Sequence, residues 1–551
     1  MWQIRDEKGR AVMQKRFSLL TVTFLTVVAL FAGSLLNSLF SGDSILDQAN
    51  KFKDVLSITK KYYVEDVDSQ KLTEAAIGGV LDELDPHSVY ISASQLARVN
   101  EEFQGAFEGI GIEYQVLNDT LLVVSPIAGG PSEGVGIQGG DKIVRIDDSS
   151  AIGITQEGVQ KKLRGPKGTK VRVAVYRAGM KDLLDFEITR DKIPLYTVDA
   201  GFMVDGTTGY IRVNRFAATT YDELTEALTR LQGSGMKRLI LDLRDNAGGY
   251  LEQAFKMADE LMPKGKKIVY TKGRRAEFDD EYVSQGGKYP EIPLVVLVNN
   301  SSASASEIVA GAIQDWDRGI VVGESTFGKG LVQRQFELGD GSALRLTTAR
   351  YYTPSGRLIQ RPYGPDKREY HLEAYTREES EGENVEHNAE RDSTRPVFKT
   401  MGGRTVYGGG GITPDYIVKA DRLTRYSVQL RSAQVFLQYA DAYVEARGAE
   451  LRETYGKESG KFADSFVVTD AMLAEIRAIG EKKGVKFEQE QYDTDRRFIA
   501  AFTKATIARS LWGAEGASRV MLKEDVQFKK AQSLFPEAEK FAAGMSGIKE
   551  R

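Results

Sequence analysis

A short run of serines lies where a hydroxyl group can act as a nucleophile. The run Ser301–Ser306 separates the apolar segments Leu294–Val298 and Ile308–Ile313, so it is expected to join a buried strand to a helix. Small residues at such a turn leave a hydroxyl clear of the backbone and leave N–H groups free to face a reacting oxygen. Serine is also a favoured N-cap residue, so a serine-rich helix cap is the alternative interpretation.

A serine nucleophile needs a base, and Lys329 is the best candidate in this sequence. It stands between two glycines in an apolar neighbourhood, where loss of solvent lowers the pKa of a lysine and leaves its amine neutral. Gln333 follows on the same face of an extended segment, so its amide can orient that amine. The alternatives are a solvated lysine and a solvated strand residue.

Composition excludes several other kinds of chemistry. The chain of 551 residues has no cysteine, which rules out thiol catalysis, disulfides and thiolate metal sites. Its net charge of −4 gives no sign of nucleic-acid binding. The three histidines are widely separated in the sequence, which disfavours a histidine metal site and a serine–histidine–aspartate triad; they are His87, His371 and His387. We therefore expect neither a metal nor a cofactor.

Residues 192–421 are predicted to form the α/β core that positions these groups. Strands and helices alternate there; the strands are Gly209–Val213, Leu239–Leu243, Leu294–Val298 and Gly319–Gly323, and Thr220–Leu231 is a helix. The turn Arg244–Gly249 follows the second of these strands. The polar stretch 362–405 is predicted to be an exposed insertion. Residues 422–551 are predicted to be an amphipathic helical region in which we find no chemistry.

Residues 97–191 are predicted to form a compact β-rich unit that resembles a PDZ domain. Its loop consists of Gly109, Ile110, Gly111 and Ile112 and occupies the place of the carboxylate-binding loop of such domains. Successive backbone N–H groups in a loop of this kind hold a chain-terminal carboxylate, and the neighbouring strand edge pairs with the peptide. Arg164 closes the helix of this unit and is a candidate for sensing the peptide or the core; a solvated arginine is the alternative.

The N-terminal region combines a basic segment, an apolar segment and predicted helices. Residues 1–16 carry a net positive charge and are expected to stay in the cytoplasm, whereas residues 17–40 are free of charge and long enough to cross a bilayer. An uncleaved membrane anchor is favoured, and a cleaved signal peptide is the rival. Residues 41–96 are predicted to be helical. Either interpretation of residues 17–40 places the bulk of the chain outside the cytoplasm, in the cell envelope and periplasm.

Two further motifs are set aside. Ser57 and Lys60 match the S-x-x-K motif of penicillin-binding enzymes, but the companion motifs are absent from the sequence. Gly130–Gly134 matches the G-x-S-x-G elbow of hydrolases, but it lies inside the PDZ-like unit without a partner histidine.

Several motifs in a fixed order resemble the carboxyl-terminal processing (tail-specific) serine proteases over residues 44–420. They are Asp242–Gly249, Ser302–Glu307, Phe327–Gly330 with Gln333, Tyr351–Gly356 and Gly410–Asp415. The resemblance implies a ClpP/crotonase-like protease core with an inserted PDZ domain, between helical N- and C-terminal regions. It also implies Ser304 as nucleophile, Lys329 as base and Gln333 as the residue that orients it. By the same resemblance, the oxyanion hole would be formed by the N–H group of Ala305 and by one N–H group of the Gly248–Gly249 turn. Gly248 is the preferred donor of that turn.

These observations predict a membrane-anchored serine endopeptidase with a serine–lysine dyad. It is expected to recognise free protein C-termini through the PDZ domain and to cut exported proteins. One rival is a non-catalytic PDZ scaffold on a protease-like core, and another is a serine–lysine esterase or acyltransferase. A homo-oligomer and an adaptor protein both remain open as partners.

Overall fold

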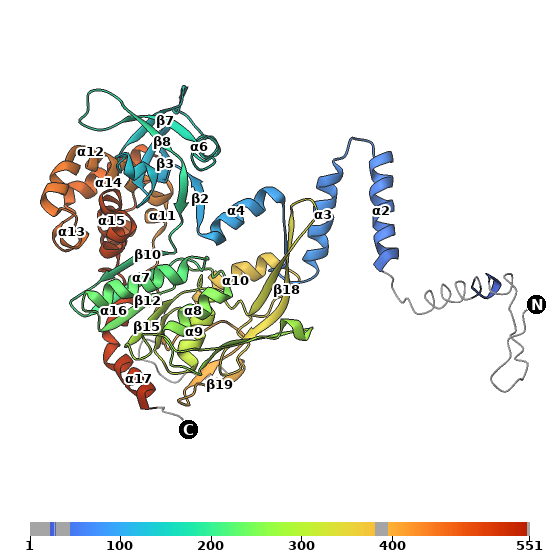
Figure 1. Ribbon diagram of the computed structural model, residues 1–551. Coiled ribbons are helices and arrows are strands. Elements are labelled where there is room, and N and C mark those ends of the chain that lie inside the picture. The colour runs from blue at the N-terminus through green and yellow to red at the C-terminus, as the bar shows by residue number, and fades with distance from the viewer. Residues whose placement is uncertain (1–22, 27, 29–44, 381–394, 548–551) are drawn as a thin grey trace, which may run out of the picture. The chain divides into compact units, whose positions relative to one another are not determined.

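The structure is a computed structural model that describes residues 23–26, 28, 45–380 and 395–547 (Figure 1). The predicted cytoplasmic segment 1–16 and most of the predicted anchor 17–40 lie outside the described residues. Within the described part of the chain, no helix combines the length and the apolar character needed to cross a membrane. The chain divides into two compact units, Met1–Val80 and Leu81–Arg551.

The first unit contains a helix, α2 (Ile45–Tyr62), and most of a second helix, α3 (Ser69–Asp82). The predicted helices of this region are therefore present. The predicted apolar stripe of α2, however, is not buried by the described residues: Phe52 and Val55 are both exposed.

The protease core is built on a six-stranded sheet in the order β10-β11-β12-β15-β16-β21. β10 runs antiparallel to β11 and the other neighbours are parallel. Its strands are β10 (Val198–Met203), β11 (Thr208–Val213), β12 (Arg238–Asp242), β15 (Leu294–Val298), β16 (Ile320–Gly323) and β21 (Tyr416–Ile417). The apolar runs buried on both faces explain why the predicted strands appear close to their expected positions.

Helices cover both faces of this sheet. On one face, a large apolar cluster joins the sheet to α7 (Thr220–Gly233), α8 (Leu251–Glu260) and α9 (Ala305–Asp315). On the other face, Ile240, Val295 and Leu297 pack against α16 (Val526–Ser533) and α17 (Phe535–Gly547). The last two helices come from the predicted C-terminal helical region, so that region completes the core.

A second sheet lies beside the core in the order β1-β18-β13-β14, with β17 paired to β18. Its strands are β1 (Val89–Ile91), β13 (Lys267–Gly273), β14 (Glu281–Val283), β17 (Leu331–Glu337) and β18 (Ala343–Tyr352), and a short 3₁₀ helix spans Ala276–Phe278. β1 falls in the region predicted to be helical. The hairpin β17–β18 places Gln333 directly opposite Thr347.

The predicted PDZ domain is a separate six-stranded sheet in the order β3-β4-β5-β7-β8, with β6 paired to β5. A two-stranded ribbon of β2 and β9 connects it to the core. Its elements are β2 (Ala106–Gly109), β3 (Ile112–Leu117), β4 (Thr120–Pro126), α5 (Pro131–Gly134), β5 (Lys142–Ile146), β6 (Ser149–Ser150), α6 (Gln156–Leu163), β7 (Lys170–Tyr176), β8 (Leu184–Thr189) and β9 (Asp191–Pro194). Helix α4 (Ala93–Gln104) precedes the ribbon and crosses the predicted boundary at residue 97.

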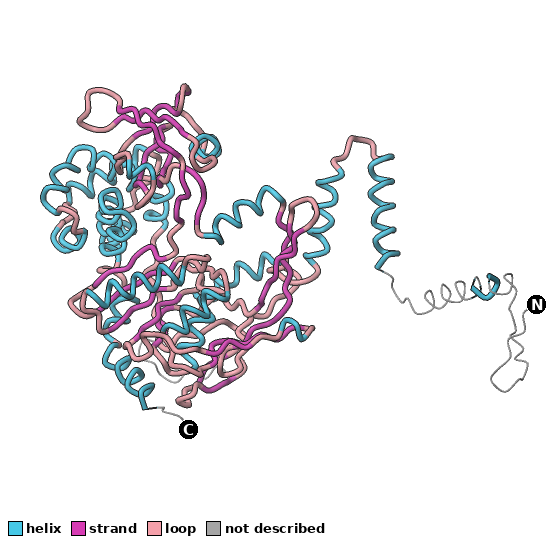
Figure 2. The backbone as a smooth tube through the Cα atoms, viewed as in Figure 1, coloured by secondary structure: helices cyan, strands magenta, loops and turns pink. Residues whose placement is uncertain are grey.

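The remaining C-terminal helices pack together around one apolar cluster (Figure 2), and two of them contact the PDZ domain. They are α11 (Arg425–Ser432), α12 (Val435–Tyr455), α13 (Ser459–Ser465), α14 (Asp470–Lys482) and α15 (Gln489–Met521). Lys142 of β5 pairs with Glu445 of α12 at 2.8 Å, and Glu113 of β3 pairs with Arg509 of α15 at 2.6 Å. The multidomain α/β fold with a PDZ-like unit and helical end regions is confirmed.

The polar stretch 362–405 is more ordered than a simple exposed insertion. It contains α10 (Lys367–Ser380), the strand β19 (Val397–Lys399) and the start of β20 (Thr405–Tyr407), whereas residues 381–394 lie outside the described residues. Tyr370 of α10 is buried, because its ring packs against Phe327 and His87 near the protease site.

Candidate active site

One cavity of about 560 Å³ contains the three predicted catalytic side chains. Ser304 reaches it from the start of α9, Lys329 from the segment that precedes β17, and Gln333 from β17 itself. The turn after β12 and helix α4 also contribute to the lining, with Gly248 and Phe103, respectively. The topology therefore gathers groups that are far apart in the sequence into one concave site.

Ser304 has an uncommon backbone conformation. Its φ of 55° and ψ of −109° place a non-glycine residue in a strained region at the N-cap of α9. The surrounding structure holds it there: its N–H donates to Glu307 Oε2 at 2.8 Å, and Tyr351 Oη donates to its carbonyl at 3.1 Å. Strain of this kind at a strand-to-helix turn is typical of a nucleophile presented to a substrate.

The neighbouring serines have structural partners instead. Ser302 is fully buried and donates its hydroxyl to the carbonyl of Leu243 at 2.8 Å. Ser306 is also fully buried and donates to the carbonyl of Asn246 at 2.8 Å. Their hydroxyls fasten the serine turn to the turn after β12, which leaves Ser304 as the serine of the run that faces the cavity.

Glu307 joins the serine and lysine segments. Its buried carboxylate accepts hydrogen bonds from the N–H groups of Ser304 and Lys329, at 2.8 and 2.9 Å, and from Gly328 N–H at 2.7 Å. It also accepts one from the hydroxyl of Thr326 at 2.6 Å. Burial raises the pKa of Glu307, and these hydrogen bonds counteract that effect. The sequence motif contains Glu307, but nothing in the sequence alone indicates this role.

Lys329 has the low pKa that a base requires. Burial, helped by the positive charge of Arg345, lowers its pKa to about 8 against the opposing effects of Glu307 and Asp85. Since the ordinary value is 10.5, a substantial fraction of the amine is neutral near pH 8. Arg345 of β18, which the sequence analysis missed, also lines the cavity.

Gln333 lies in the same cavity, and its amide is held by β18. Its Nε2 donates to Thr347 Oγ1 at 3.1 Å. Among the described residues, the side chain of Lys329 forms no hydrogen bond with Gln333 or with the Ser304 hydroxyl. The catalytic roles of these side chains therefore remain predictions that their shared cavity supports.

The predicted oxyanion hole has close backbone contacts. Ala305 is the first residue of α9, where backbone N–H groups have no partner within the helix. Gly248 lies so close that a Cβ atom there would be 2.9 Å from Ala305 N, and its φ of 97° also favours glycine. The N–H of Gly248 donates to Asn246 Oδ1 at 2.8 Å, so it would have to exchange this bond to hold an oxyanion. The adjacent Gly249 has no such bond within the described chain and is the other donor offered by the turn.

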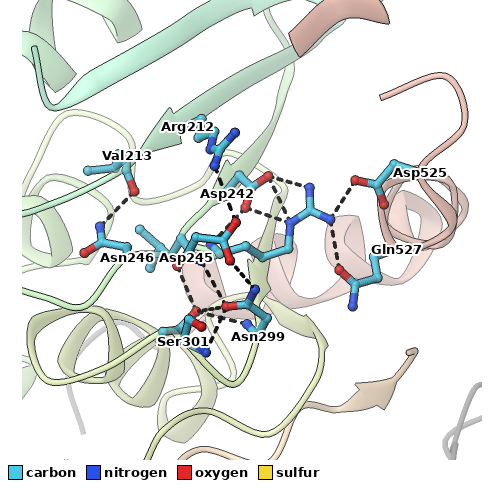
Figure 3. A network of polar contacts seen from close by, with 12 residues as sticks. Arg212, Val213, Asp242, Asp245, Asn246, Asn299, Ser301, Asp525 and Gln527 are labelled. Atoms are coloured by element: carbon cyan, nitrogen blue, oxygen red, sulfur yellow. Dashed lines mark hydrogen bonds and ion pairs between the residues drawn. The ribbon is translucent and has the colours of Figure 1, made fainter. Parts of the chain in front are cut away.

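A polar network fixes the two turns against each other (Figure 3). Asp245 N–H donates to Asn299 Oδ1 at 2.9 Å, and Asn299 Nδ2 donates back to Asp245 Oδ1 at 2.8 Å. In the same network, Arg244 forms ion pairs with Asp242 and with Asp525, the N-cap residue of α16, both at 2.6 Å. The C-terminal region thereby reaches the start of the Arg244–Gly249 turn, a link that the sequence did not predict.

Two histidines that are distant in the sequence lie close to each other near the protease site. The rings of His87 and His371 lie 6.3 Å apart, and His87 Nε2 is 3.0 Å from Tyr370 Oη. Burial, with a contribution from Lys329, lowers the pKa of His87 to about 3, so its ring is neutral at physiological pH. His87 does not line the cavity with Ser304. His387 lies outside the described residues.

The predicted peptide site of the PDZ domain is a groove of about 160 Å³. It lies between the start of β3 and α6, and its lining includes Ile110, Gly111, Ile112 and Arg164. Gly109, the first residue of the predicted loop, ends β2 beside it. Arg164 also pairs with Glu101 of α4 at 2.6 Å and lies over the ring of Phe107.

Comparisons with known protein families agree with this arrangement. The profile of peptidase family S41 matches residues 207–367, and a PDZ domain profile matches residues 109–188. The profile of the activating protease CtpB N-terminal domain matches residues 35–95, and a family of unknown function, DUF8443, matches residues 426–513. The core is thus that of a serine-type peptidase.

Comparisons with individual proteins identify the group of proteases to which the chain belongs. A carboxy-terminal-processing protease of Bartonella bacilliformis is 41% identical over 321 residues, covering 57% of this chain and 73% of the relative. The carboxy-terminal processing protease CtpA of Bacillus subtilis is 36% identical over 360 residues, covering 63% and 76%. The photosystem II D1 C-terminal processing protease structure is 31% identical, covering 56% and 83% with a TM-score of 0.32. The chain belongs to the carboxy-terminal-processing proteases of peptidase family S41.

Proposed function

We propose that this peptidase is an endopeptidase that uses a Ser304–Lys329 dyad and selects substrates by their free C-termini. The observation that carries the proposal is the shared cavity of Ser304 and Lys329, in which Ser304 is strained and the pKa of Lys329 is lowered to about 8. The same cavity contains Gln333.

The reaction is an acyl transfer in two halves. Neutral Lys329 accepts the proton of Ser304 Oγ as this oxygen attacks the carbonyl carbon of the scissile peptide bond. The N–H group of Ala305 and one from the Gly248–Gly249 turn stabilise the oxyanion. Lys329 then donates the proton to the leaving amine, and the C–N bond breaks. Water, deprotonated by the neutral amine, hydrolyses the Ser304 ester and restores both groups.

The PDZ domain supplies the selection. A substrate C-terminus adds a strand beside Gly111–Ile112, and its carboxylate meets the N–H groups of the Gly109–Ile112 loop. Binding there raises the rate only if the bound PDZ domain favours an open protease site. The ion pair Arg164–Glu101 can couple the PDZ groove to the protease cavity. Glu101 lies on α4, and the same helix contributes Phe103 to the lining of that cavity.

The charge-free segment 17–40 supports membrane anchoring with residues 41–551 outside the cytoplasm. N-terminal sequencing of the native protein distinguishes this arrangement from secretion. A mature chain that begins beyond residue 30 would instead indicate a cleaved signal peptide.

Cleavage of casein, an unfolded protein, tests the catalytic proposal. Ser304→Ala should abolish cleavage, since loss of a catalytic nucleophile removes several orders of magnitude in rate. Ser302→Ala and Ser306→Ala are matched controls, which should keep much of the activity of the folded enzyme. An active Ser304→Ala enzyme beside an inactive Ser306→Ala enzyme would refute the assignment. Hydrolysis of esters without cleavage of peptide bonds would favour the esterase alternative, and no turnover at all would favour the scaffold.

A further inference from the structure

The loop Asp85–Ser88, which joins α3 to β1, reaches the protease site through a chain of hydrogen bonds. Gln333 Nε2 donates to Thr347 Oγ1, and Thr347 Oγ1 donates to Asp85 Oδ1, both at 3.1 Å. Ser88 Oγ also accepts from Thr347 N–H at 3.1 Å and donates to Asp85 Oδ2 at 2.6 Å. Asp85 and Thr347 are thus connected by two routes, although they are 262 residues apart in the sequence.

The environment of Asp85 keeps its carboxyl group ionised. The residue is buried, and burial opposes ionisation, but its hydrogen bonds hold its pKa below the ordinary value. The N–H groups of His87 and Ser88 both donate to Oδ1, at 2.8 and 3.0 Å. An ionised carboxylate only accepts hydrogen bonds, so the single proton of the Thr347 hydroxyl points toward Asp85.

The direction of this chain determines the orientation of the Gln333 amide. Because Thr347 commits its proton to Asp85, its oxygen can only accept from Gln333. The amide therefore turns its NH₂ group toward Thr347 and its carbonyl oxygen away from Thr347. A neutral lysine amine that directs its lone pair at Ser304 needs an acceptor for its N–H groups, and the carbonyl oxygen of Gln333, which lines the same cavity as Lys329, is the candidate acceptor.

We propose that Asp85 is a positioning residue for the protease reaction, acting through Thr347 to orient the Gln333 amide toward Lys329. The inference rests on the proposed function, in which Gln333 orients the base. It adds the source of that orientation, a carboxylate on the loop that precedes β1.

A double-mutant cycle in the full-length protein tests this role. Asp85→Asn retains the shape of the side chain but supplies an NH₂ donor, so the Thr347 hydroxyl can reverse its direction. We expect kcat for casein or peptide cleavage to fall roughly tenfold or more, within the range of coupled residues. In a Gln333→Ala background, the same substitution should cost less than about twofold, because the residue through which it acts is already absent.

Two further comparisons separate positioning from folding. Thr347→Val breaks the chain at its centre and should lower kcat as Asp85→Asn does, whereas Thr347→Ser keeps the hydroxyl and should retain activity. Asp340→Asn is the matched control, since Asp340 also holds a turn of the β17–β18 hairpin through Ser342 but has no link to Gln333. Its activity should remain unchanged. Urea unfolding identifies any variant that fails to fold. If Asp85→Asn fails to fold, the comparison of Thr347→Val with Thr347→Ser tests the proposal in its place.

The outcomes are distinct from those of the proposed function. An equal loss from Asp85→Asn in the parent and in Gln333→Ala would overturn the positioning role and leave the Ser304–Lys329 dyad intact. Full activity of Gln333→Ala would overturn it as well. Cleavage by Ser304→Ala would instead refute the proposed function itself.

Discussion

At the scale of single residues, the proposed chemistry depends on the competition between burial and charge at Lys329. Burial and Arg345 favour the neutral amine, whereas Glu307 and Asp85 favour the ammonium form. Burial is the largest of these effects, so the pKa falls to about 8. A base with a pKa near the working pH can both accept and return a proton, as an acyl transfer requires.

This balance predicts the pH dependence of the enzyme. Protonated Lys329 cannot accept a proton, so kcat/KM should rise with pH and level off above a midpoint near pH 8, the pKa of Lys329. Lys329→Arg should lose about 10³-fold or more, because a guanidinium group does not deprotonate. Peptide cleavage measured from pH 5 to 10 checks both statements. A profile with its midpoint near pH 6.5, or an active Lys329→Arg enzyme, would contradict the dyad.

A second prediction concerns Arg345. A nearby positive charge disfavours protonation of Lys329, so Arg345→Gln should raise the pKa of Lys329 and move the kcat/KM midpoint to higher pH. Arg345→Lys keeps the charge and should keep the midpoint. The pH profile is the relevant measurement, because a change in substrate binding alone alters the height of the curve but leaves its midpoint in place. An unmoved midpoint in Arg345→Gln would show that Arg345 does not act on Lys329.

The sequence pointed to the proposed catalytic residues more readily than to the residues that surround them. Ser304 and Lys329 stand out because their type and spacing form a motif. Asp85 and Arg345 have no local signal, since their effects arise from contacts with residues far away in the sequence. Gly248 was predicted from its motif, but the hydrogen bond of its N–H to Asn246 depends on turn geometry that a sequence does not reveal.

At the scale of secondary structure, the predicted elements are those with continuous apolar runs. β15 is fully buried over Leu294–Val298, and its predicted limits match the structure. The strand β18 was missed, and β17 was predicted only as an extended segment around Gln333, because most residues of both strands are partly or fully exposed and no apolar run marks them. β1 was missed because it has only three residues and pairs with β18, a distant strand.

The PDZ groove provides a prediction at this scale. Gly111 has a φ of 76°, and a Cβ atom there would lie 3.0 Å from Ile193 and 3.4 Å from Pro131. Gly111→Val should therefore distort the carboxylate loop and remove the preference for free C-termini, while Ser304 stays reactive. The measurement compares cleavage of peptides with free and amidated C-termini.

Gly153 offers a control in the same domain. Its φ of 74° imposes a similar backbone strain, but no atom lies within 4 Å of an added Cβ. Gly153→Val should keep the preference for free C-termini. Equal cleavage of free and amidated peptides by the unmutated enzyme would contradict the proposal that the PDZ domain reads the terminus.

At the scale of the whole molecule, the C-terminal region is a structural part of the peptidase. Its helices α16 and α17 cover one face of the core sheet, while α12 and α15 contact the PDZ domain. The amphipathic pattern of residues 422–551 predicted helices correctly. It could not show that they pack on two different domains, because an apolar face does not specify its partner.

Phe535 tests the contribution of this region to stability. Its side chain is fully buried in the cluster between the core sheet and α17. Phe535→Ala should lower the free energy of unfolding by about 3–5 kcal/mol, the usual cost of removing a buried phenylalanine ring. Val467→Ala, at an exposed position of the same region, is the control and should change stability little. Urea denaturation followed by circular dichroism measures both, and equal stability of the two variants would contradict the proposed packing.

The most direct test of the central claim is to locate the acyl group formed during the reaction and to follow its formation with pH. An activated ester is mixed with the full-length enzyme, the reaction is quenched with acid, and the modified peptide is identified by mass spectrometry. The account predicts acylation of Ser304 that accelerates as pH rises through about 8 and is lost in Lys329→Arg. Acylation of another serine, or acylation of Ser304 at the same rate in Lys329→Arg, would contradict the account.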